Sequence, residues 1–200
     1  MILTITGPSG SGKTVLRRRL LKHPGIKNLV SSTTRAPRKG EKEGEDYFFV
    51  NDLNTPAKFD KRKYSFQTFF DSNWYALKKD CADSAANDNK NTWISIVDKI
   101  GALEMKKAYG DKVITLYIEI DPYKAKDNMK FRKGGKKRAI ARQKIDKEMG
   151  LLSPYAEEKD NRKILYDVVI KNSNDMNMMV NDVINVLIAK NTKGKNVGAG

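Results

Sequence analysis

A glycine-rich segment near the beginning of the chain constrains the fold more than any other feature. It reads Gly7-Pro8-Ser9-Gly10-Ser11-Gly12-Lys13-Thr14, two glycines five positions apart followed by Lys-Thr, and the apolar residues 2–6 lead directly into it. A buried strand, a tight turn and a helix opening at Lys13 would point backbone N–H groups and the positive end of a helix dipole at one anion. We therefore predict a phosphate-binding loop.

The side chains of this loop suit a di- or triphosphate that carries a metal ion. Lys13 would reach the β- and γ-phosphates, and the Thr14 hydroxyl would ligate Mg2+. The alternative, a glycine-rich turn that merely joins a strand to a helix, leaves the Lys-Thr pair and both flanks unexplained. The expected nucleotide-binding residues are Gly7, Ser9, Gly10, Ser11, Gly12, Lys13 and Thr14.

Short β-branched runs alternate with helical patterns through much of the chain. The runs 93–97, 113–120 and 168–170 each end at a polar break, and helical patterns cover 99–109, 123–132, 138–149 and 175–189. This order predicts an α/β fold, a parallel sheet flanked by helices, with its ligand at the carboxyl ends of the strands. We assign residues 1–30, 92–125 and 155–190 to this core.

Other stretches have a different character. Residues 31–80 contain short alternating runs broken by polar turns, which predict a small, mostly β insert. Positions 130–147 are strongly basic and hold nine Lys or Arg against Asp146 alone. Residues 82–91 are small and polar, as in a loop or hinge, and residues 191–200 are expected to form a disordered tail.

The basic composition implies anionic ligands without identifying them. Lys and Arg outnumber Asp and Glu by 39 to 24, a net charge of +15. Nucleic acid would explain this balance, and so would two nucleotide substrates or compositional drift. No apolar stretch approaches the roughly 20 residues of a membrane span, so we expect a cytoplasmic protein without membrane association. The single cysteine, Cys81, fits a reducing compartment.

A second motif covers residues 33–49. It reads Thr33-Thr34-Arg35-Ala36-Pro37-Arg38-Lys39-Gly40-Glu41-Lys42-Glu43-Gly44-Glu45-Asp46-Tyr47-Phe48-Phe49. The two arginines and the tyrosine could converge on one phosphate, because guanidinium groups make bidentate contacts and the phenol adds a donor. A solvated, charged surface hairpin would explain the same residues equally well.

With Ser31-Ser32 before it and the phosphate loop upstream, this motif resembles the signature of the guanylate kinase family. The resemblance is dense over residues 1–50, patchy over 51–125 and mostly architectural beyond. It implies a P-loop nucleoside monophosphate kinase in three parts. These are the core with the phosphate loop, a monophosphate-binding domain at 31–80 and a lid at 126–154.

The resemblance also implies roles for individual residues. Arg35, Arg38, Tyr47 and Tyr75 match the clamp on the acceptor phosphate, with Arg38 counted among the catalytic residues beside Lys13. Ser31 matches the serine that family members aim at the guanine carbonyl, Glu41 a carboxylate bordering the site, and Asp98 a strand-end aspartate. The lid arginines fall loosely on Arg132 and Arg142.

Three departures from the family pattern concern the base. Phe66 stands where the family has a glutamate that reads guanine, Leu77 where it has a serine, and Ile96 where it has an aspartate. A carboxylate accepts from guanine N1–H and N2–H2, and phenylalanine cannot. We therefore expect phosphate binding to be retained and base preference to be relaxed or changed.

The leading hypothesis is an enzyme that moves the γ-phosphoryl of ATP, with Mg2+, onto a nucleoside monophosphate. GMP or dGMP is the acceptor that the resemblance implies, and the altered base positions leave room for a modified or pyrimidine nucleotide. One alternative is a non-catalytic protein-binding module, against which Lys13 and Thr14 argue. Another is a kinase or binder of polynucleotide, for which no base-stacking motif is present. The sequence leaves open a monomer or a homodimer.

Overall fold

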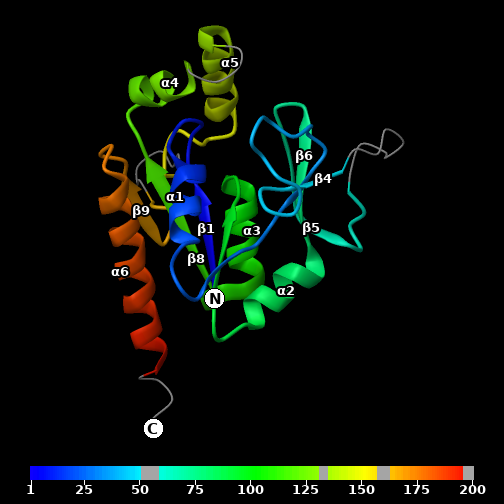
Figure 1. Ribbon diagram of the computed structural model, residues 1–200, viewed down its shortest axis with the longest axis vertical. Helices are drawn as coiled ribbons and strands as arrows, with labels where there is room; N and C mark the ends of the chain where they lie inside the picture. Colours follow the sequence, from blue (N-terminus) through cyan, green and yellow to red (C-terminus); the bar gives the residue numbers. More distant parts are fainter. Residues whose placement is uncertain (51–58, 131–134, 157–162, 196–200) are drawn as a thin grey trace.

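The predicted α/β core is confirmed. A computed structural model of the chain describes residues 1–50, 59–130, 135–156 and 163–195, and residues 51–58, 131–134, 157–162 and 196–200 lie outside this description. A five-stranded parallel sheet has the order β2-β7-β1-β8-β9. Figure 1 labels β1, β8 and β9 of this sheet. Its strands are β1 (Ile2–Thr6), β2 (Ile26–Asn28), β7 (Thr92–Ile96), β8 (Val113–Glu119) and β9 (Val168–Lys171).

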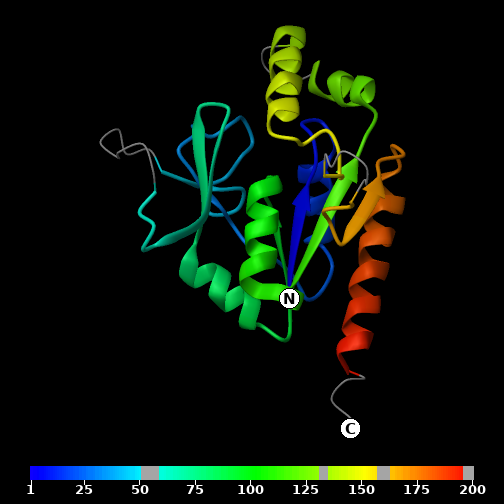
Figure 2. The same ribbon diagram turned by 180° about the vertical axis from the view of Figure 1, so that it is seen from behind.

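Helices cover both faces of this sheet. Helices α1 (Lys13–Leu20) and α6 (Met176–Lys195) pack on one face, and α3 (Lys99–Tyr109) packs on the other, where Figure 2 shows it in front of the strands. Successive side chains of a strand point to opposite faces, so Leu3 of β1 joins the α1 and α6 side and Ile2 joins the α3 side. All five residues of β1 are buried, as expected for a central parallel strand.

The predicted insert is a four-stranded sheet of its own, beside the core in Figure 1. Its order is β4-β3-β6-β5, with β3 (Ser32–Thr33), β4 (Phe48–Phe49), β5 (Tyr64–Phe70) and β6 (Asn73–Lys78). Strands β5 and β6 form an antiparallel hairpin whose turn residues Asp71 and Ser72 both have positive φ. The pairing shifts register between Ser65 and Thr68, which is where Phe66 adopts a φ of 54°.

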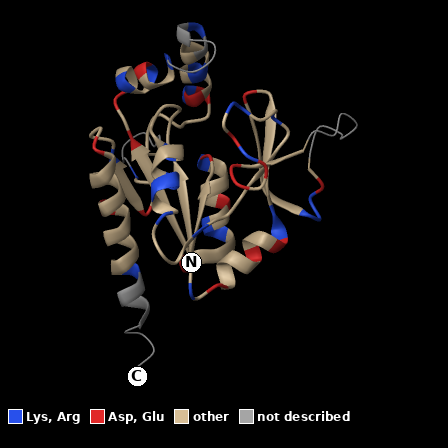
Figure 3. Cartoon of the chain, in the orientation of Figure 1, with Lys and Arg blue, Asp and Glu red and all other residues tan. Residues whose placement is uncertain are grey.

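The lid consists of two helices, α4 (Pro122–Lys130) and α5 (Gly135–Glu148), which pack against each other beyond the carboxyl ends of the sheet strands (Figure 1). Figure 3 shows Lys and Arg on both helices and on α1. A 3-10 turn (Gly110–Lys112) precedes β8. None of the helices in the described ranges has the length and apolarity needed to cross a membrane.

Two local expectations were wrong. Residues 82–91 were expected to form a loop, but helix α2 (Lys79–Asn87) includes most of them, because Ala82, Ala85 and Ala86 line one buried face. The tail was expected to be disordered from residue 191, but α6 continues to Lys195. Residues 196–200 of that tail lie outside the described residues.

Candidate functional site

The phosphate loop connects β1 to α1 in the way the motif predicts. Gly7, Gly10 and Gly12 have φ values of 146°, 86° and 93°, which L side chains rarely adopt. A Cβ atom at Gly7 would lie 2.7 Å from the carbonyl oxygen of Ile118, and one at Gly10 would collide with the backbone of Ala125. Glycine is therefore required by backbone conformation and by close packing against β8 and α4.

Neighbouring elements hold this loop in place. Asn172, just after β9, donates from Nδ2 to the carbonyl oxygen of Ser11 at 2.9 Å, and Asn128 of α4 donates to that of Gly10 at 3.0 Å. The Lys13 ammonium donates to the carbonyl oxygens of Gly7 and Pro8 at 2.7 and 2.8 Å. The lysine thus lies folded over its own loop, where the motif expects a phosphate.

The insert contributes a cluster around Arg35, whose side chain is buried. Its guanidinium makes a bidentate contact with Glu41 at 2.9 and 3.0 Å, and Glu41 also accepts from the Arg38 backbone N–H at 2.7 Å. Burial alone would lower the pKa of Arg35, but the hydrogen bonds with Glu41, together with the charge of Glu41 and the interactions with Tyr75, outweigh burial and raise the pKa. The same contacts lower the pKa of Glu41 although burial opposes this. Arg35 is therefore held as a cation.

Aromatic rings surround the same guanidinium. Arg35 lies 5.2 Å from the centre of the Tyr47 ring, which meets the Tyr75 ring edge-on at 5.9 Å. Burial raises the pKa of the Tyr47 phenol, so the phenol stays a donor. The buried Nε of Arg35 has no hydrogen-bond partner among the described residues. The cluster thus retains an unmatched donor, as a site for an anion would.

Arg38 lies beside this cluster on the wall of the same pocket. Partial desolvation by the pocket walls, with the positive charges of Arg35 and Arg142 nearby, lowers the pKa of Arg38. Three cations from two separate segments therefore gather in one place, and a phosphate would relieve their mutual repulsion.

A buried ion pair fixes the insert to the core. Arg17 of α1 donates to Asp46 at 2.6 Å, and Arg18 contacts the same carboxylate at 3.3 Å. Asp46 immediately precedes Tyr47 in the sequence, and it also accepts from the backbone N–H of Lys42 at 3.2 Å. The helix that follows the phosphate loop is thereby connected to the segment that carries the Arg35 cluster.

The pocket is mostly apolar at its other end. Phe66, Leu77 and Ile96 line it, and the Phe66 ring also packs against the cluster under α3, 5.9 Å from the ring of Tyr109. Two polar groups lie there. The Asp98 carboxylate accepts hydrogen bonds from the Gly101 N–H at 2.7 Å and from the Thr68 hydroxyl. The Ser31 hydroxyl oxygen lies 3.5 Å from that of Ser95. Sequence spacing missed Thr68, since the register shift that aligns it with Tyr75 is invisible in the sequence.

The lid helix α5 reaches both sides of the pocket. Arg142 forms an ion pair with Asp71 of the β5–β6 turn at 2.7 Å and lies 4.8 Å from the centre of the Phe70 ring. Asp146 accepts from the backbone N–H and the hydroxyl of Ser9 at 2.8 and 3.1 Å. Neither Asp71 nor Asp146 was among the site residues predicted from the sequence. The other expected lid arginine, Arg132, lies outside the described residues.

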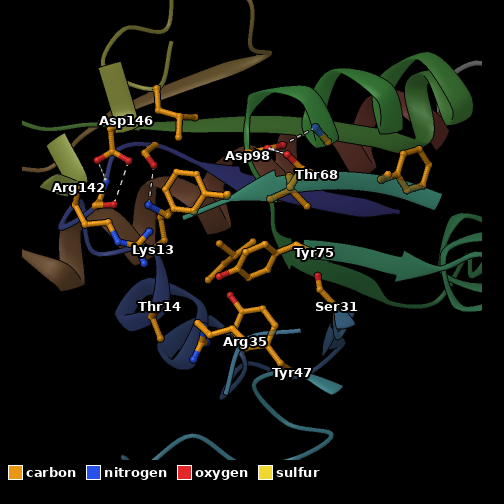
Figure 4. A pocket seen from close by; sticks show the side chains of 18 of the residues that line it. Lys13, Thr14, Ser31, Arg35, Tyr47, Thr68, Tyr75, Asp98, Arg142 and Asp146 are labelled. Atoms are coloured by element: carbon orange, nitrogen blue, oxygen red, sulfur yellow. Dashed lines mark hydrogen bonds between the residues drawn. The ribbon is translucent and has the colours of Figure 1, made fainter. Parts of the chain in front are cut away.

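All three parts of the chain therefore line one pocket. Figure 4 shows Lys13 and Asp146 on one side of it, Thr68 and Asp98 on the other, and Tyr75 between them. Two expected residues do not line the pocket, because Ser11 is buried within the loop and the Glu41 carboxylate is paired with the Arg35 guanidinium. The expected residues that line it are Gly7, Ser9, Gly10, Gly12, Lys13, Thr14, Ser31, Arg35, Arg38, Tyr47, Phe66, Tyr75, Asp98 and Arg142.

Comparison with known proteins gives a consistent result. Residues 1–190 match the family model described as guanylate kinase. A guanylate kinase of Chlorobium chlorochromatii is 31% identical over 121 residues, 59% of this chain and 62% of that protein. One of Prochlorococcus marinus is 35% identical over 109 residues, 54% and 59% of the two chains. The chain thus spans about three fifths of the length of these curated relatives.

The fold has a counterpart among solved structures. The crystal structure of guanylate kinase from Anaplasma phagocytophilum superposes with a TM-score of 0.66 at 21% identity, and the match covers 96% of this chain and 86% of that one. At this identity the likeness concerns the fold.

Proposed function

The chain belongs to the guanylate kinase family, and from that premise we propose that it transfers the γ-phosphoryl group of ATP to a nucleoside 5'-monophosphate, giving a diphosphate. GMP or dGMP is the proposed acceptor. One observation carries this proposal, namely that the phosphate loop and the Arg35 cluster open into the same pocket. Two phosphate-binding arrangements that face one space are what a reaction between two nucleotides requires.

The proposed chemistry needs positioning and charge neutralisation. An oxygen of the acceptor phosphate is already nucleophilic, so no general base is required. Lys13 would leave the carbonyl oxygens of its own loop and contact the γ-phosphate, while Arg35, Arg38, Tyr47 and Tyr75 would orient the acceptor. Arg142 would contribute its charge from the lid and help exclude water.

Mg2+ would accompany the nucleotide. Thr14 follows Lys13 at the start of α1 and lines the pocket with an exposed side chain, so its hydroxyl is accessible to an ion carried by ATP. Mg2+ is typically coordinated by one or two protein ligands together with substrate phosphates and water, and the single Thr14 hydroxyl is consistent with that coordination. When bound, the ion would neutralise charge on the β- and γ-phosphates.

A screen of acceptors tests the proposal. ADP release with Mg2+ and ATP would be measured against each common ribo- and deoxynucleoside monophosphate, with Lys13→Ala as the blank. We expect turnover that requires both the monophosphate and Lys13. No turnover with any monophosphate would contradict the proposal and favour a binding module, against which the intact Lys13 and Thr14 argue.

A further inference from the structure

Helix α5 places a carboxylate on the phosphate loop. The Asp146 carboxylate accepts hydrogen bonds from the Ser9 backbone N–H at 2.8 Å and from the Ser9 hydroxyl at 3.1 Å, and the residue is only 1% exposed. The backbone N–H groups of such a loop are the donors that a bound phosphate uses. One of these donors is therefore occupied by an anion that belongs to the protein.

The surroundings of Asp146 resemble those of a bound phosphate. Burial raises the pKa of Asp146, while the two Ser9 donors and the positive charges of Lys13 and Arg142 favour its ionised form. Lys13 is the residue that the motif assigns to the γ-phosphate. A triphosphate and the Asp146 carboxylate cannot both use these groups, because like charges a few ångströms apart repel strongly inside a protein.

The same helix also contacts the insert. Arg142 lies four positions before Asp146, so both side chains project from one face of α5. Arg142 is paired with Asp71 at 2.7 Å, and the residue is 9% exposed. Asp146 thus connects the lid to the phosphate loop, and Arg142 connects it to the β5–β6 turn of the insert. Figure 4 shows the two side chains next to each other, near Lys13.

We propose that Asp146 is an internal competitor for ATP, which occupies the phosphate loop and holds α5 over it until the triphosphate displaces the carboxylate. This inference rests on the proposed function, because it takes ATP to be the ligand of the loop. Displacement of Asp146 moves the helix that also carries Arg142, so ATP binding releases Arg142 from Asp71 and makes it available to the phosphates. Asp146 itself performs no chemical step.

The proposal predicts that the carboxylate weakens ATP binding. If the loop is occupied by Asp146 about 90% of the time, the apparent affinity for ATP is reduced about tenfold, since only the remaining fraction can bind. Asp146→Asn keeps the shape of the side chain and removes its charge. Asp127→Asn is a matched control, because it removes the same charge from α4, where Asp127 is exposed and paired with Lys130.

The experiment is calorimetric titration of the full chain with ATP and Mg2+ in the absence of any monophosphate, with thermal unfolding as the check on folding. We expect Asp146→Asn to bind ATP about tenfold more tightly than the wild type and Asp127→Asn to bind within twofold of it. Asp146→Ala gives the same test if the asparagine variant fails to fold.

Equal or weaker ATP binding by a folded Asp146 variant, beside a wild type that binds, would overturn the inference and leave the proposed function standing. It would mean that Asp146 supports the loop through Ser9. No ATP binding by the wild type or by any variant would overturn the proposed function, and the inference with it.

Discussion

The two ends of the pocket are built in different ways. At the phosphate end, backbone N–H groups, Lys13 and the Arg35 cluster come from contiguous sequence motifs. At the base end, the walls are apolar side chains such as Phe66 and Ile96, and the polar pair Thr68 and Asp98 comes from strand β5 of the insert and from the N-terminus of helix α3 in the core. A phosphate is the same in every nucleotide, whereas the base differs. Under the proposed function, the phosphate end would therefore determine the reaction class, and the base end would determine which nucleotide is used.

Removal of Lys13 is the most severe test of the phosphate end. Lys13→Ala should lower kcat by about 10^3 or more, the scale for loss of a principal group that stabilises the transition state. The fold should persist, because Lys13 lies on the pocket wall. Steady-state ADP release measures the effect and circular dichroism checks the fold. Near-normal turnover in a folded variant would contradict the enzyme assignment.

Removal of Arg38 separates the two substrates. Arg38→Ala should raise the KM for the monophosphate by roughly 10- to 100-fold, as expected when a charged hydrogen bond is lost. The KM for ATP should change little. Lys39→Ala is the matched control, because it removes an adjacent exposed cation that is not on the pocket wall. An equal change in both KM values would mean that Arg38 does not belong to the acceptor side.

The base end is tested by comparing kcat/KM for dGMP, dAMP, dTMP and dCMP. The ring of Phe66 packs against the apolar cluster under α3 and offers no acceptor to guanine. The advantage of dGMP should therefore stay below about 10^4, the range reached by sites built on such polar contacts. A larger advantage would show that another carboxylate reads guanine, with Asp98 as the first residue to examine.

The smallest expected effect concerns Thr68. Thr68→Val removes the hydroxyl that donates to Asp98 and should change the ratio of kcat/KM between dGMP and dAMP by about two- to tenfold, the scale of one neutral hydrogen bond. Thr68→Ser keeps the hydroxyl and should restore the ratio. A shift in the KM for ATP without a shift in this ratio would place the role of Thr68 outside base recognition.

The sequence predictions were more successful at the phosphate end of the pocket than at the base end. The phosphate loop and the Arg35 segment are local motifs, and each specifies a backbone conformation by its own glycines and short spacings. The helices of the core and its strands other than β2 followed from the hydrophobic pattern, and the sequence did not indicate β2. Helix α2 did not, since its apolar face consists of alanines whose burial depends on the elements packed around them.

The residues that the sequence did not reveal depend on contacts between distant segments. Thr68 faces Asp98 because of a register shift within β5, and Asp146 reaches Ser9 across 137 positions of the chain. The pairing of Arg142 with Asp71 joins the lid to a turn of the insert. No local pattern encodes such contacts.

The sequence by itself determined the phosphate loop, the order of the core elements and the segment that carries Arg35, because glycine conformation and hydrophobic periodicity are properties of neighbouring residues. Only the tertiary structure decided that these segments share one pocket, that Phe66 packs against an apolar cluster, and that Asp146 lies on the loop. The physical reason is that a carboxylate or a ring acquires its role from the charges and surfaces that folding brings to it.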